Sequence, residues 1–568
     1  MFSEFLRREI SATLIAIGLP EVAFGLEHPT VASHGDFATN AAMVVAKSVG
    51  KNPRTLAEEL VVALTSRAIK GVKTIAIAGP GFINFTIEDE VFRGEVERIV
   101  EEGEIYGKED SWDGKKILVE HSSPNLFKPF HIGHLMNNAV GESIKRLAEF
   151  SGAGKVTSIS FPSDVSLGIA KAVYVVAQDG IEKLRACKTE QDKLAYLGAC
   201  YAKGTQLYEE SDVVKAEVLE ISKTLFERIP GNILDIFEEC KTINLDYFVE
   251  TTKRLGSHFD AYIFESEAGK VGEQLVATHI GDVFAKSEGA IIYEGEQDGL
   301  HTRVFVNKEG RPTYEAKDLG LLSLKFDRYN PDLSLFITDH EQASHFDVVL
   351  AAAKRINPLW EKLSIHRTHG RMTFKGQKMS SRLGGVPLAA DIIDTLAEEV
   401  RERAPQLIDE DIDRVAIGAI KFAILRAAAG KNINFDPDTS LSFEGDSGPY
   451  LQYTVVRARS VLTKAAAEGY VACKRGECVV PTTEVTQIEK MLTRFPEVVQ
   501  LSINEWAPHH IATYLLETAQ AFNGWYGNTK ILDTENPAIG YNLAIAKATS
   551  IVIERGLTLL GIAVPSKM

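Results

Sequence analysis

The stretch KPFHIGHLMNN (128–138) decides the fold, because it joins two patterns that are typical of a parallel sheet. The run before it, KKILVE (115–120), has the apolar character of a buried β-strand, and the residues from His131 onward have helical spacing. A second strand-like run, KVTSISF (155–161), follows that helix. This alternation predicts a parallel sheet with crossover helices.

Two histidines stand at the expected junction of strand and helix. His131 and His134 are one helical turn apart, where free N–H groups of a helix N-terminus can bind an anion and imidazoles can donate hydrogen bonds to a phosphate. Gly133 would let a flat base approach the backbone closely. The pattern also fits a plain helix start with surface histidines, and no third ligand at a telling spacing indicates a metal.

A second motif, GQKMSSRLGG (376–385), is a glycine-flanked loop with two cations around two serines. Such a loop can close over a polyphosphate, and its lysine would stabilise the charge that develops on a leaving pyrophosphate. Alone, the loop also fits a solvated basic surface. Together with the upstream HIGH, it indicates a nucleotide-binding site.

The 568 residues predict three or four domains at roughly 150 residues each. Residues 1–108 read as a small α+β unit, with two strand runs in TIAIAGPGFINFTI (74–87). Residues 115–375 read as the parallel-sheet domain, with a mostly helical insertion at about 166–250. Strand-like signals resume there in GAIIYEG (289–295), TRVFVN (302–307) and LSLFITD (333–339).

The remaining chain divides into a loop with a connecting stem and a helical region. Residues 376–415 contain the KMSS loop and the stem. Residues 416–568 have helical periods throughout and predict a helix bundle, for example in VAIGAIKFAILRAAAG (415–430) and YNLAIAKATSIVIERGLTLLG (541–561).

Charge and composition bound the function. The 62 Lys and Arg against 78 Asp and Glu give a net charge of −16, which argues against a nucleic-acid partner on charge alone. From Ala416 onward, however, basic and acidic residues are equal in number, so this region can still present a basic face. No apolar run approaches the roughly 20 residues of a membrane span, and MFSEFLRREISATLIAIGLPE (1–21) reads as an amphipathic helix rather than a signal peptide.

The five cysteines are odd in number and scattered along the chain: Cys187, Cys200, Cys240, Cys473 and Cys478. None has the C-x-x-C spacing of a zinc site. This usage predicts a reducing cytoplasmic location and no protein-bound zinc.

The two motifs resemble HIGH and KMSKS, the nucleotide-binding signatures of class I aminoacyl-tRNA synthetases. The resemblance sharpens to the arginyl-tRNA synthetases and covers nearly the whole chain. It rests on VEHSSPNLFKPFHIGHL (119–135), GDFATN (35–40), AGPGFINF (78–85), LGSHFDAYIFES (255–266), RPTYEAKDLGL (311–321), ITDHEQASHF (337–346), GPYLQYTVVRAR (448–459), AQAFNGWYG (519–527) and RGLTLLGIAVPSKM (555–568).

The resemblance implies a Rossmann-type (HUP-like) catalytic domain, a small N-terminal α+β domain that contacts tRNA, and an all-α anticodon-binding bundle. It implies ligation of L-arginine to tRNA(Arg) through an arginyl-adenylate, in which ATP is consumed and AMP and pyrophosphate are released. Mg²⁺ is expected with ATP as its counter-ion rather than as a metal held by the protein. We expect a cytoplasmic monomer with no membrane partner.

The resemblance also implies site residues. The catalytic residues would be His131, His134, Lys378 and Lys128, and ATP would further contact Phe130, Gly133, Met379, Ser380, Ser381 and Arg382. Arginine would be held by Glu120, Ser123, Asn125, Tyr314, Asp318 and Gln342. Carboxylates suit its guanidinium, because that group carries five donors and no acceptor. The tRNA would contact Tyr450, Tyr453, Phe522, Tyr526 and Met568 in the bundle and Phe37 and Asn40 in the N-terminal domain.

Two stretches depart from the family pattern. The second signature reads KMSSR and lacks the second lysine of KMSKS; we hypothesise that Lys128 supplies that charge from the other side. The segment SFPSDVSLGIAK (160–171) differs from the commoner family version, which leaves the contribution of its strand open.

Other classes of protein compete with this interpretation. A small nucleotidyltransferase with an H-x-G-H motif would lack the helical C-terminal region, and a binding protein without catalysis would not need the HIGH histidines and Lys378. The cysteinyl enzyme needs a zinc site with cysteine ligands. The glutaminyl and glutamyl enzymes would need a cationic pocket instead of Glu120 and Asp318.

Overall fold

The computed structural model describes residues 1–128, 130–374 and 388–568. These residues form two compact units. Unit 1 comprises Met1–Gly107, Thr454–Gln500 and Tyr514–Arg555. Unit 2 comprises Lys108–Tyr453, Leu501–Thr513 and Gly556–Met568. The C-terminal third of the chain therefore contributes residues to both units.

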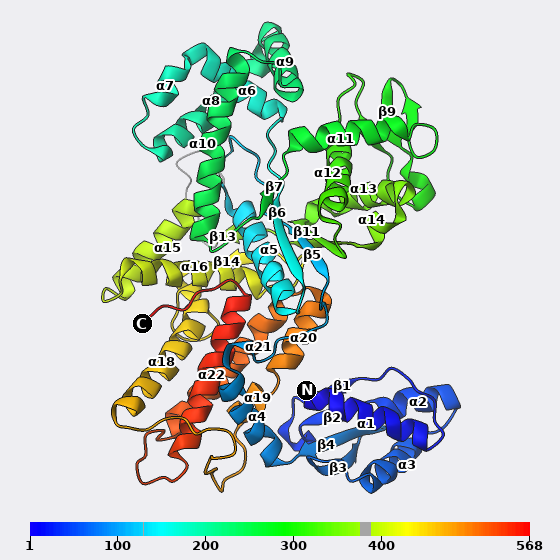
Figure 1. Ribbon diagram of the computed structural model, residues 1–568, viewed down its shortest axis with the longest axis vertical. Coiled ribbons are helices and arrows are strands. Elements are labelled where there is room, and N and C mark those ends of the chain that lie inside the picture. The colour runs from blue at the N-terminus through cyan, green and yellow to red at the C-terminus, as the bar shows by residue number, and fades with distance from the viewer. Residues whose placement is uncertain (129, 375–387) are drawn as a thin grey trace. The chain divides into compact units, whose positions relative to one another are not determined.

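Unit 2 contains a five-stranded parallel sheet in the order β12-β11-β5-β6-β7 (Figure 1). Its apolar strands are largely buried, as expected where helices cover both faces of a parallel sheet. The strands are β5 (Lys116–Glu120), β6 (Lys155–Ser160), β7 (Ala261–Tyr262), β11 (Leu333–Asp339) and β12 (Ser364–His369).

The topology of this sheet places a ligand-binding edge beside β5. The chain runs from β5 through α5 (Ile132–Phe150) to β6, whereas β11 pairs with the opposite edge of β5. The strand order therefore reverses between β5 and β11, and ligands of open parallel sheets bind beyond the carboxyl ends of the strands at such a point. The predicted strand–helix–strand unit is confirmed.

A helical segment with its own apolar core separates β6 from β7. Its helices are α6 (Leu167–Asp179), α7 (Ile181–Arg185), α8 (Glu190–Glu210), α9 (Asp212–Glu227) and α10 (Asn232–Arg254). They lie together in Figure 1.

The three strand-like runs predicted after residue 288 all form strands, but two of them belong to a sheet separate from the parallel one. The runs at 289–295 and 302–307 form β9 (Ala290–Tyr293) and β10 (Arg303–Val306), which pair antiparallel with each other and with β8 (Ala285–Ser287). Short connections favour antiparallel pairing, because a parallel pair needs a long crossover. Only LSLFITD joins the parallel sheet, as β11.

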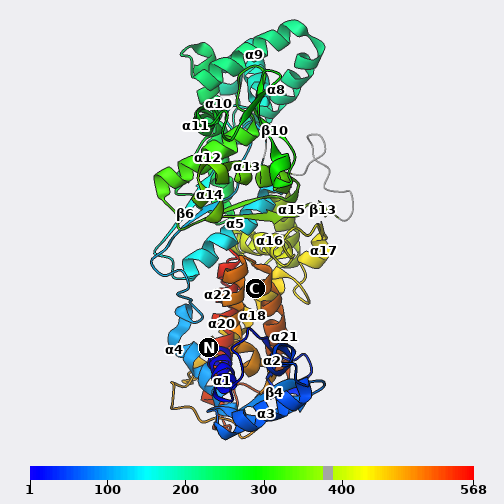
Figure 2. The same cartoon turned by 90° about the vertical axis from the view of Figure 1, so that its right-hand side faces the viewer.

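The remaining helices of this part of unit 2 are α11 (Glu265–Thr278), α12 (Tyr314–Tyr329), α13 (Ala343–Ile356), α14 (Pro358–Lys362), α15 (Ala389–Arg403), α16 (Asp409–Leu425) and α17 (Pro437–Ser440). Helices α15 and α16 pack side by side (Figure 2). Two short strands, β13 (Met372–Phe374) and β14 (Ile433–Phe435), pair parallel.

The segment Gly556–Met568 completes the interior of unit 2. Lys421 of α16 is fully buried, and its Nζ donates to the backbone oxygen of Gly561 at 2.8 Å. Gln452 Nε2 donates to the backbone oxygen of Ala563 at 2.6 Å. Because the amine of Lys421 is out of water, it needs hydrogen-bond acceptors, and the backbone oxygens of Gly561 and Leu255 provide them.

Unit 1 begins with an α+β fold. An antiparallel sheet in the order β1-β2-β4-β3 is covered by helices that bury their apolar faces on it (Figure 1). Gly79 and Gly81 take positive φ values, which glycine adopts readily, in the turn between β3 and β4. The elements are α1 (Phe2–Ala16), β1 (Leu26–Glu27), β2 (Phe37–Thr39), α2 (Ala41–Val49), α3 (Pro53–Ser66), β3 (Val72–Ala78), β4 (Phe82–Ile87) and α4 (Asp89–Glu102).

The C-terminal region is helical, as predicted. Its helices are α18 (Gly448–Ala467), α19 (Gln487–Leu492), α20 (Phe495–Glu505), α21 (His509–Asn528) and α22 (Ile539–Leu559). Within unit 1 they bond to the N-terminal fold: Lys490 Nζ lies 2.7 Å from Asp36 Oδ1, and His28 Nε2 lies 2.9 Å from Glu497 Oε2.

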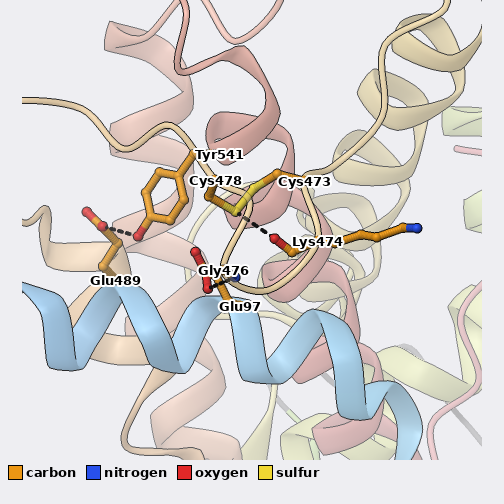
Figure 3. Close-up of a disulfide and its surroundings, with 7 residues drawn as sticks. All are labelled: Glu97, Cys473, Lys474, Gly476, Cys478, Glu489 and Tyr541. Atoms are coloured by element: carbon orange, nitrogen blue, oxygen red, sulfur yellow. Dashed lines mark hydrogen bonds between the residues drawn. A yellow bond between two sulfur atoms is a disulfide. The ribbon is translucent and has the colours of Figure 1, made fainter.

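A disulfide that the sequence did not predict joins Cys473 and Cys478 in the loop between α18 and α19 (Figure 3). The N–H of Gly476 inside this loop donates to Glu97 of α4 at 2.9 Å. Arg475 pairs with Glu101 of the same helix at 3.0 Å. The disulfide therefore closes a short loop that contacts α4.

Across the described ranges, no helix is long and apolar enough to span a membrane.

Candidate active site

His131 and His134 begin helix α5 and cap it. His131 is the N-cap residue, and its Nδ1 accepts the N–H of Gly133 at 3.1 Å. Nδ1 of His134 accepts the N–H of His131 at 3.3 Å. Because each Nδ1 is an acceptor, a neutral ring in this geometry carries its proton on Nε2.

The surroundings keep both rings uncharged at neutral pH. Burial, helped by the nearby His131 and Lys128, lowers the pKa of His134 to about 3. Burial and Lys128 also lower the pKa of His131. Each imidazole therefore presents an Nε2–H donor rather than a positive charge at the N-terminus of α5, where an anion is favoured.

The contacts of Gly133, Phe130 and Lys128, the residues around the two histidines, differ from those that the motif suggests. A Cβ on Gly133 would lie 3.1 Å from Cε1 of His131, so this glycine makes room for the histidine ring. Phe130 is buried in the core beside His134, which leaves its side chain little surface for ATP. Lys128 is exposed, and its Nζ lies 5.4 Å from the centre of the Tyr201 ring in α8.

Glu120, the last residue of β5, is buried and paired with a lysine. Its Oε2 accepts from Lys325 Nζ of α12 at 2.7 Å, and both residues are nearly inaccessible to water. Lys325 also lies 4.9 Å from the centre of the Phe336 ring on β11. Glu120 therefore stands at the carboxyl edge of the sheet, beside β11, with one of its oxygens already bonded.

Asp318 of α12 is held by a histidine. His345 Nε2 lies 2.6 Å from Asp318 Oδ2, and His345 Nδ1 lies 3.4 Å from Glu315 Oε1. Burial raises the pKa of Asp318, while His345 opposes that rise and the charges of Glu120 and Glu265 add to it. Burial alone would lower the pKa of His345, but its bonds to Asp318 and Glu315 raise it to about 9.

Glu265 is a further carboxylate that the sequence analysis did not single out. It is buried at the start of α11, and its Oε1 accepts from Lys317 Nζ at 2.9 Å. Its charge acts on both Asp318 and Tyr314. The sequence signal was an acidic residue after a strand-like run, which also fits an ordinary first helical turn.

The other predicted arginine-binding residues lie at the same edge of the sheet. Ser123 and Asn125 follow β5, and Gln342 ends a short 3₁₀ helix directly after β11. Tyr314 begins α12 and is 61% exposed, so its ring is available to a ligand. Ser123, Asn125 and Gln342 thus follow the carboxyl ends of the neighbouring strands β5 and β11, and Tyr314 and Asp318 stand in the first turns of α12. Their roles toward arginine stay predictions.

Comparison with known proteins identifies the family. The catalytic-domain model of class I tRNA synthetases (R) matches residues 95–436, which is more than half of the chain. The chain belongs to the arginyl-tRNA synthetase family. The arginyl-tRNA synthetase N-terminal domain matches residues 4–87, and the DALR anticodon-binding domain matches residues 451–568.

Relatives and solved structures agree with this family. The chain is 30% identical to an arginine–tRNA ligase of Clostridium perfringens over 555 residues, with 96% of each chain covered. It is 29% identical to that of Lactobacillus acidophilus, again over 96% of each chain. The arginyl-tRNA synthetase of Thermus thermophilus has the same fold, with a TM-score of 0.82, 23% identity and full coverage of both chains.

The family fold comprises the parts that the sequence predicted: a class I, Rossmann-type catalytic domain, an N-terminal domain and a C-terminal DALR helical domain. The residues predicted to bind pyrophosphate and ATP from the second signature lie outside the described part of the chain. They are Lys378, Met379, Ser380, Ser381 and Arg382.

The burial of Phe522 argues against its predicted role in stacking on tRNA bases. Its ring is fully buried in unit 1 against Trp525 and Tyr526. Aromatic residues at helical spacing can lie in the core or on the surface, and the ring of Phe522 lies in the core. Tyr526 is half-buried, and the guanidinium of Arg457 lies 5.1 Å from the centre of its ring.

The remaining residues of family interest for tRNA also have contacts within the fold. Phe37 is buried in the N-terminal core, and Asn40 Oδ1 accepts the N–H of Gly25 at 2.7 Å. Met568 packs against the core that α15 and α16 share in unit 2. Tyr450, Tyr453 and Met568 are half-buried, and their roles toward tRNA stay predictions.

Proposed function

We propose that this chain carries out the reaction of its family in two steps, with arginyl-adenylate as the intermediate. Membership of the family establishes the overall reaction, which is aminoacylation of tRNA with arginine. The observation that supports our assignment of residues is a cluster of carboxylates from three elements: Glu120 of β5, Asp318 of α12 and Glu265 of α11. Glu120 and Glu265 are buried, and the charges of both act on Asp318. Two neutral histidines stand at the start of α5, the helix that follows β5.

Arginine recognition would rest on Glu120, Asp318 and Glu265. A guanidinium presents five N–H donors in a plane and pairs with carboxylates in two-pronged fashion. Each of the three carboxylates bonds a cation of the fold through one oxygen. The second oxygen of Glu265 accepts from Ser163 Oγ, so Glu265 would act through its charge and through the remaining lone pairs of its oxygens. A guanidinium entering among them therefore finds acceptors in a buried site, where such bonds are strong. Tyr314 would cover the aliphatic part of the substrate.

The α-amino and carboxylate groups of arginine would be held by Ser123, Asn125 and Gln342. All three follow the carboxyl ends of β5 or β11, so they would place the substrate carboxylate toward α5. Positioning matters most here, because this reaction requires little covalent work from side chains.

In the first step an oxygen of the arginine carboxylate attacks the α-phosphorus of ATP. The bond from that phosphorus to the bridging β-oxygen breaks, and pyrophosphate leaves with the electron pair. The Nε2–H groups of His131 and His134 would donate to oxygens that gain charge in the transition state. Lys378 would bind the departing pyrophosphate, Lys128 would add charge from the other side, and Mg²⁺ would enter with ATP as its counter-ion.

In the second step a ribose hydroxyl at the 3′ end of tRNA(Arg) attacks the carbonyl carbon of the adenylate. The ester bond forms, the bond to the phosphate oxygen breaks, and AMP leaves, with the hydroxyl proton passing to an oxygen of its phosphate. Tyr450, Tyr453 and Tyr526 would contact the anticodon region. We further propose a cytoplasmic enzyme that acts as a monomer.

The test is ATP–pyrophosphate exchange over a panel of amino acids, with and without bulk tRNA. We expect exchange with arginine and none with citrulline, which has nearly the same shape but no charge. Exchange that requires tRNA would show that adenylate formation is coupled to tRNA binding. Exchange with citrulline at a rate close to that of arginine would contradict recognition by the three carboxylates.

A further inference from the structure

The loop that follows β5 has an unusual backbone at both of its ends. Ser122 has a φ of +57° and Phe127 has a φ of +66°, and both residues are buried. Side chains with a Cβ rarely adopt this left-handed region, and such residues persist only where the surroundings hold them. Between them lie Ser123 and Asn125, two of the residues that we assign to arginine binding.

An asparagine from a different helix binds the backbone N–H at each of these ends. Asn137 of α5 accepts the N–H of Ser122 through Oδ1 at 2.6 Å. Asn244 of α10 accepts the N–H of Phe127 through Oδ1 at 3.1 Å. The amide nitrogens of both asparagines are also used, so the orientation of each amide group is fixed.

Asn137 connects this loop to the neighbouring strand. Its Nδ2 donates to the backbone oxygen of Ile337 in β11 at 2.7 Å. One amide group therefore bonds the chain after β5 and the chain of β11, on the two sides of the point where the strand order reverses. Asn137 also lies one helical turn beyond His134, on the helix that begins with the two histidines.

Further bonds hold Ser122 from the remaining directions. Its backbone oxygen accepts from Ser160 Oγ of β6 at 3.0 Å, and its Oγ accepts from Asn138 Nδ2 at 3.1 Å. Asn138 is fully buried and accepts in turn from Ser257 Oγ at 3.1 Å. The backbone donor, the backbone acceptor and the hydroxyl of Ser122 each have a side-chain partner.

Asn244 gives the helical segment between β6 and β7 a part in the same arrangement. Its Nδ2 donates to the backbone oxygen of Cys240, one turn back in α10, at 2.8 Å. The loop Ser122–Phe127 is thus fixed at one end by the helix that carries the histidines and at the other end by the inserted segment.

We propose that Asn137 and Asn244 are positioning residues for arginine activation. They hold Ser122 and Phe127 in the left-handed region, and so fix the loop between them, which sets where Ser123 and Asn125 place the arginine carboxylate relative to His131 and His134. This inference rests on the proposed function of Ser123 and Asn125. It assigns the inserted segment, through Asn244, a role in the amino-acid site.

The experiment measures arginine-dependent ATP–pyrophosphate exchange, with bulk tRNA present, by the full chain carrying Asn137→Ala or Asn244→Ala. Matched controls are Ser143→Ala in α5 and Thr252→Ala in α10, which remove a buried hydroxyl from the same two helices without touching the loop. We expect kcat/KM for arginine to fall at least about tenfold in the asparagine variants, because small displacements of reacting groups have large effects on rate. The controls should stay within about threefold.

A second variant distinguishes positioning from a general structural role. Glycine adopts a positive φ without help, so Ser122→Gly should make the loop less dependent on the bond from Asn137. Asn137→Ala should therefore lower kcat/KM for arginine by a smaller factor in a Ser122→Gly background than in the wild-type background. Additive losses would overturn the proposal, as would asparagine variants whose arginine kinetics match those of the controls. Losses that vanish when rates are expressed per folded molecule would overturn it too. Absence of arginine exchange in the wild-type chain with bulk tRNA present would instead contradict the proposed function.

Discussion

Nε2 of His345 lies 2.6 Å from Oδ2 of Asp318, and the same ring reaches Glu315 through Nδ1. A buried carboxylate tends to take up a proton, because burial disfavours its charge. The imidazolium of His345 opposes that tendency at the residue that we assign to the arginine guanidinium. His345 therefore supports the ionised form of Asp318 on which recognition of a cation depends.

Replacing His345 should weaken arginine binding, because His345 supports the ionised form of Asp318. In His345→Gln the carboxylate of Asp318 loses a charged partner, a bond of about 1.5–3 kcal/mol, so kcat/KM for arginine should fall ten- to a hundredfold. The fall should be steeper toward acid pH, where the unsupported carboxylate takes up a proton. His366→Gln is the control, because burial lowers the pKa of His366 to about 4 and its ring is neutral. Equal losses in the two variants would contradict the charge argument.

The same pair predicts how stability changes with pH. The bonds to Asp318 and Glu315 raise the pKa of His345 to about 9 from its ordinary 6.5, so the folded state holds this proton more tightly than the unfolded state. The contribution is fully present below about pH 6.5 and is lost as the pH rises through about 9. The urea midpoints of wild type and His345→Gln should therefore differ at pH 6 and converge at pH 9.5. A difference that is the same at both pH values would contradict the assignment.

The buried pair of Glu120 and Lys325 predicts an effect that depends on both residues. Lys325→Met leaves Glu120 buried without its cation, which should destabilise the fold by about 3–5 kcal/mol. The double variant Glu120→Gln, Lys325→Met should recover most of that loss, because no unpaired charge remains. Arginine-dependent exchange should be absent in the double variant, because it lacks the Glu120 carboxylate. Denaturant unfolding and exchange measured together test this, and a double variant less stable than Lys325→Met would contradict it.

The two functions of His131 can be separated by substitution. Asparagine places an acceptor near the position of Nδ1 and is a favoured N-cap residue, whereas alanine is not. Both His131→Asn and His131→Ala lose the Nε2–H donor, so both should reduce exchange, by about a hundredfold if the donor acts in the transition state. Only His131→Ala should also lose about 1 kcal/mol of stability. Near-normal exchange in His131→Asn would place the importance of His131 in the cap.

The disulfide between Cys473 and Cys478 predicts a count of thiols. Three cysteines are free and two are bonded, so the unfolded chain should titrate three thiols without reductant and five after reduction. In the chain-entropy view, a closed loop this short stabilises by about 2 kcal/mol, so the reduced protein should unfold at a lower denaturant concentration. The double variant Cys473→Ser, Cys478→Ser is the control, since reductant should not change its midpoint. Five thiols in the unreduced protein would contradict the pairing.

Much of the fold follows from local sequence patterns. The period of apolar residues predicted β5, α5, β6 and the C-terminal helices, because burial of one face leaves a regular trace in the sequence. Strand pairing is less predictable, since β9 and β10 have the composition of sheet strands but take partners that only the length of their connections decides.

The candidate site shows the same division. Residues inside a motif, such as His131 and His134, could be predicted from their spacing together with the second signature, and their role toward ATP stays a prediction. Glu265 and His345 could not, because each becomes part of the site only when α11 or α13 is brought beside α12. Phe522 was misjudged for a similar reason, because an aromatic on a helix carries no mark of which side faces water.

The bond between Lys421 and Gly561 bears on how this protein is made. The two residues are separated by 140 positions, so a ribosome that has just finished α16 must translate for on the order of ten seconds before this partner exists. During that interval a lysine meant for the interior lacks one of its carbonyls, and the unit that carries the catalytic domain is incomplete. A chain cut short before Gly556 would keep the motifs for arginine and ATP but not the finished interior. The interior of the catalytic unit can therefore be completed only after translation has passed through the anticodon-binding region.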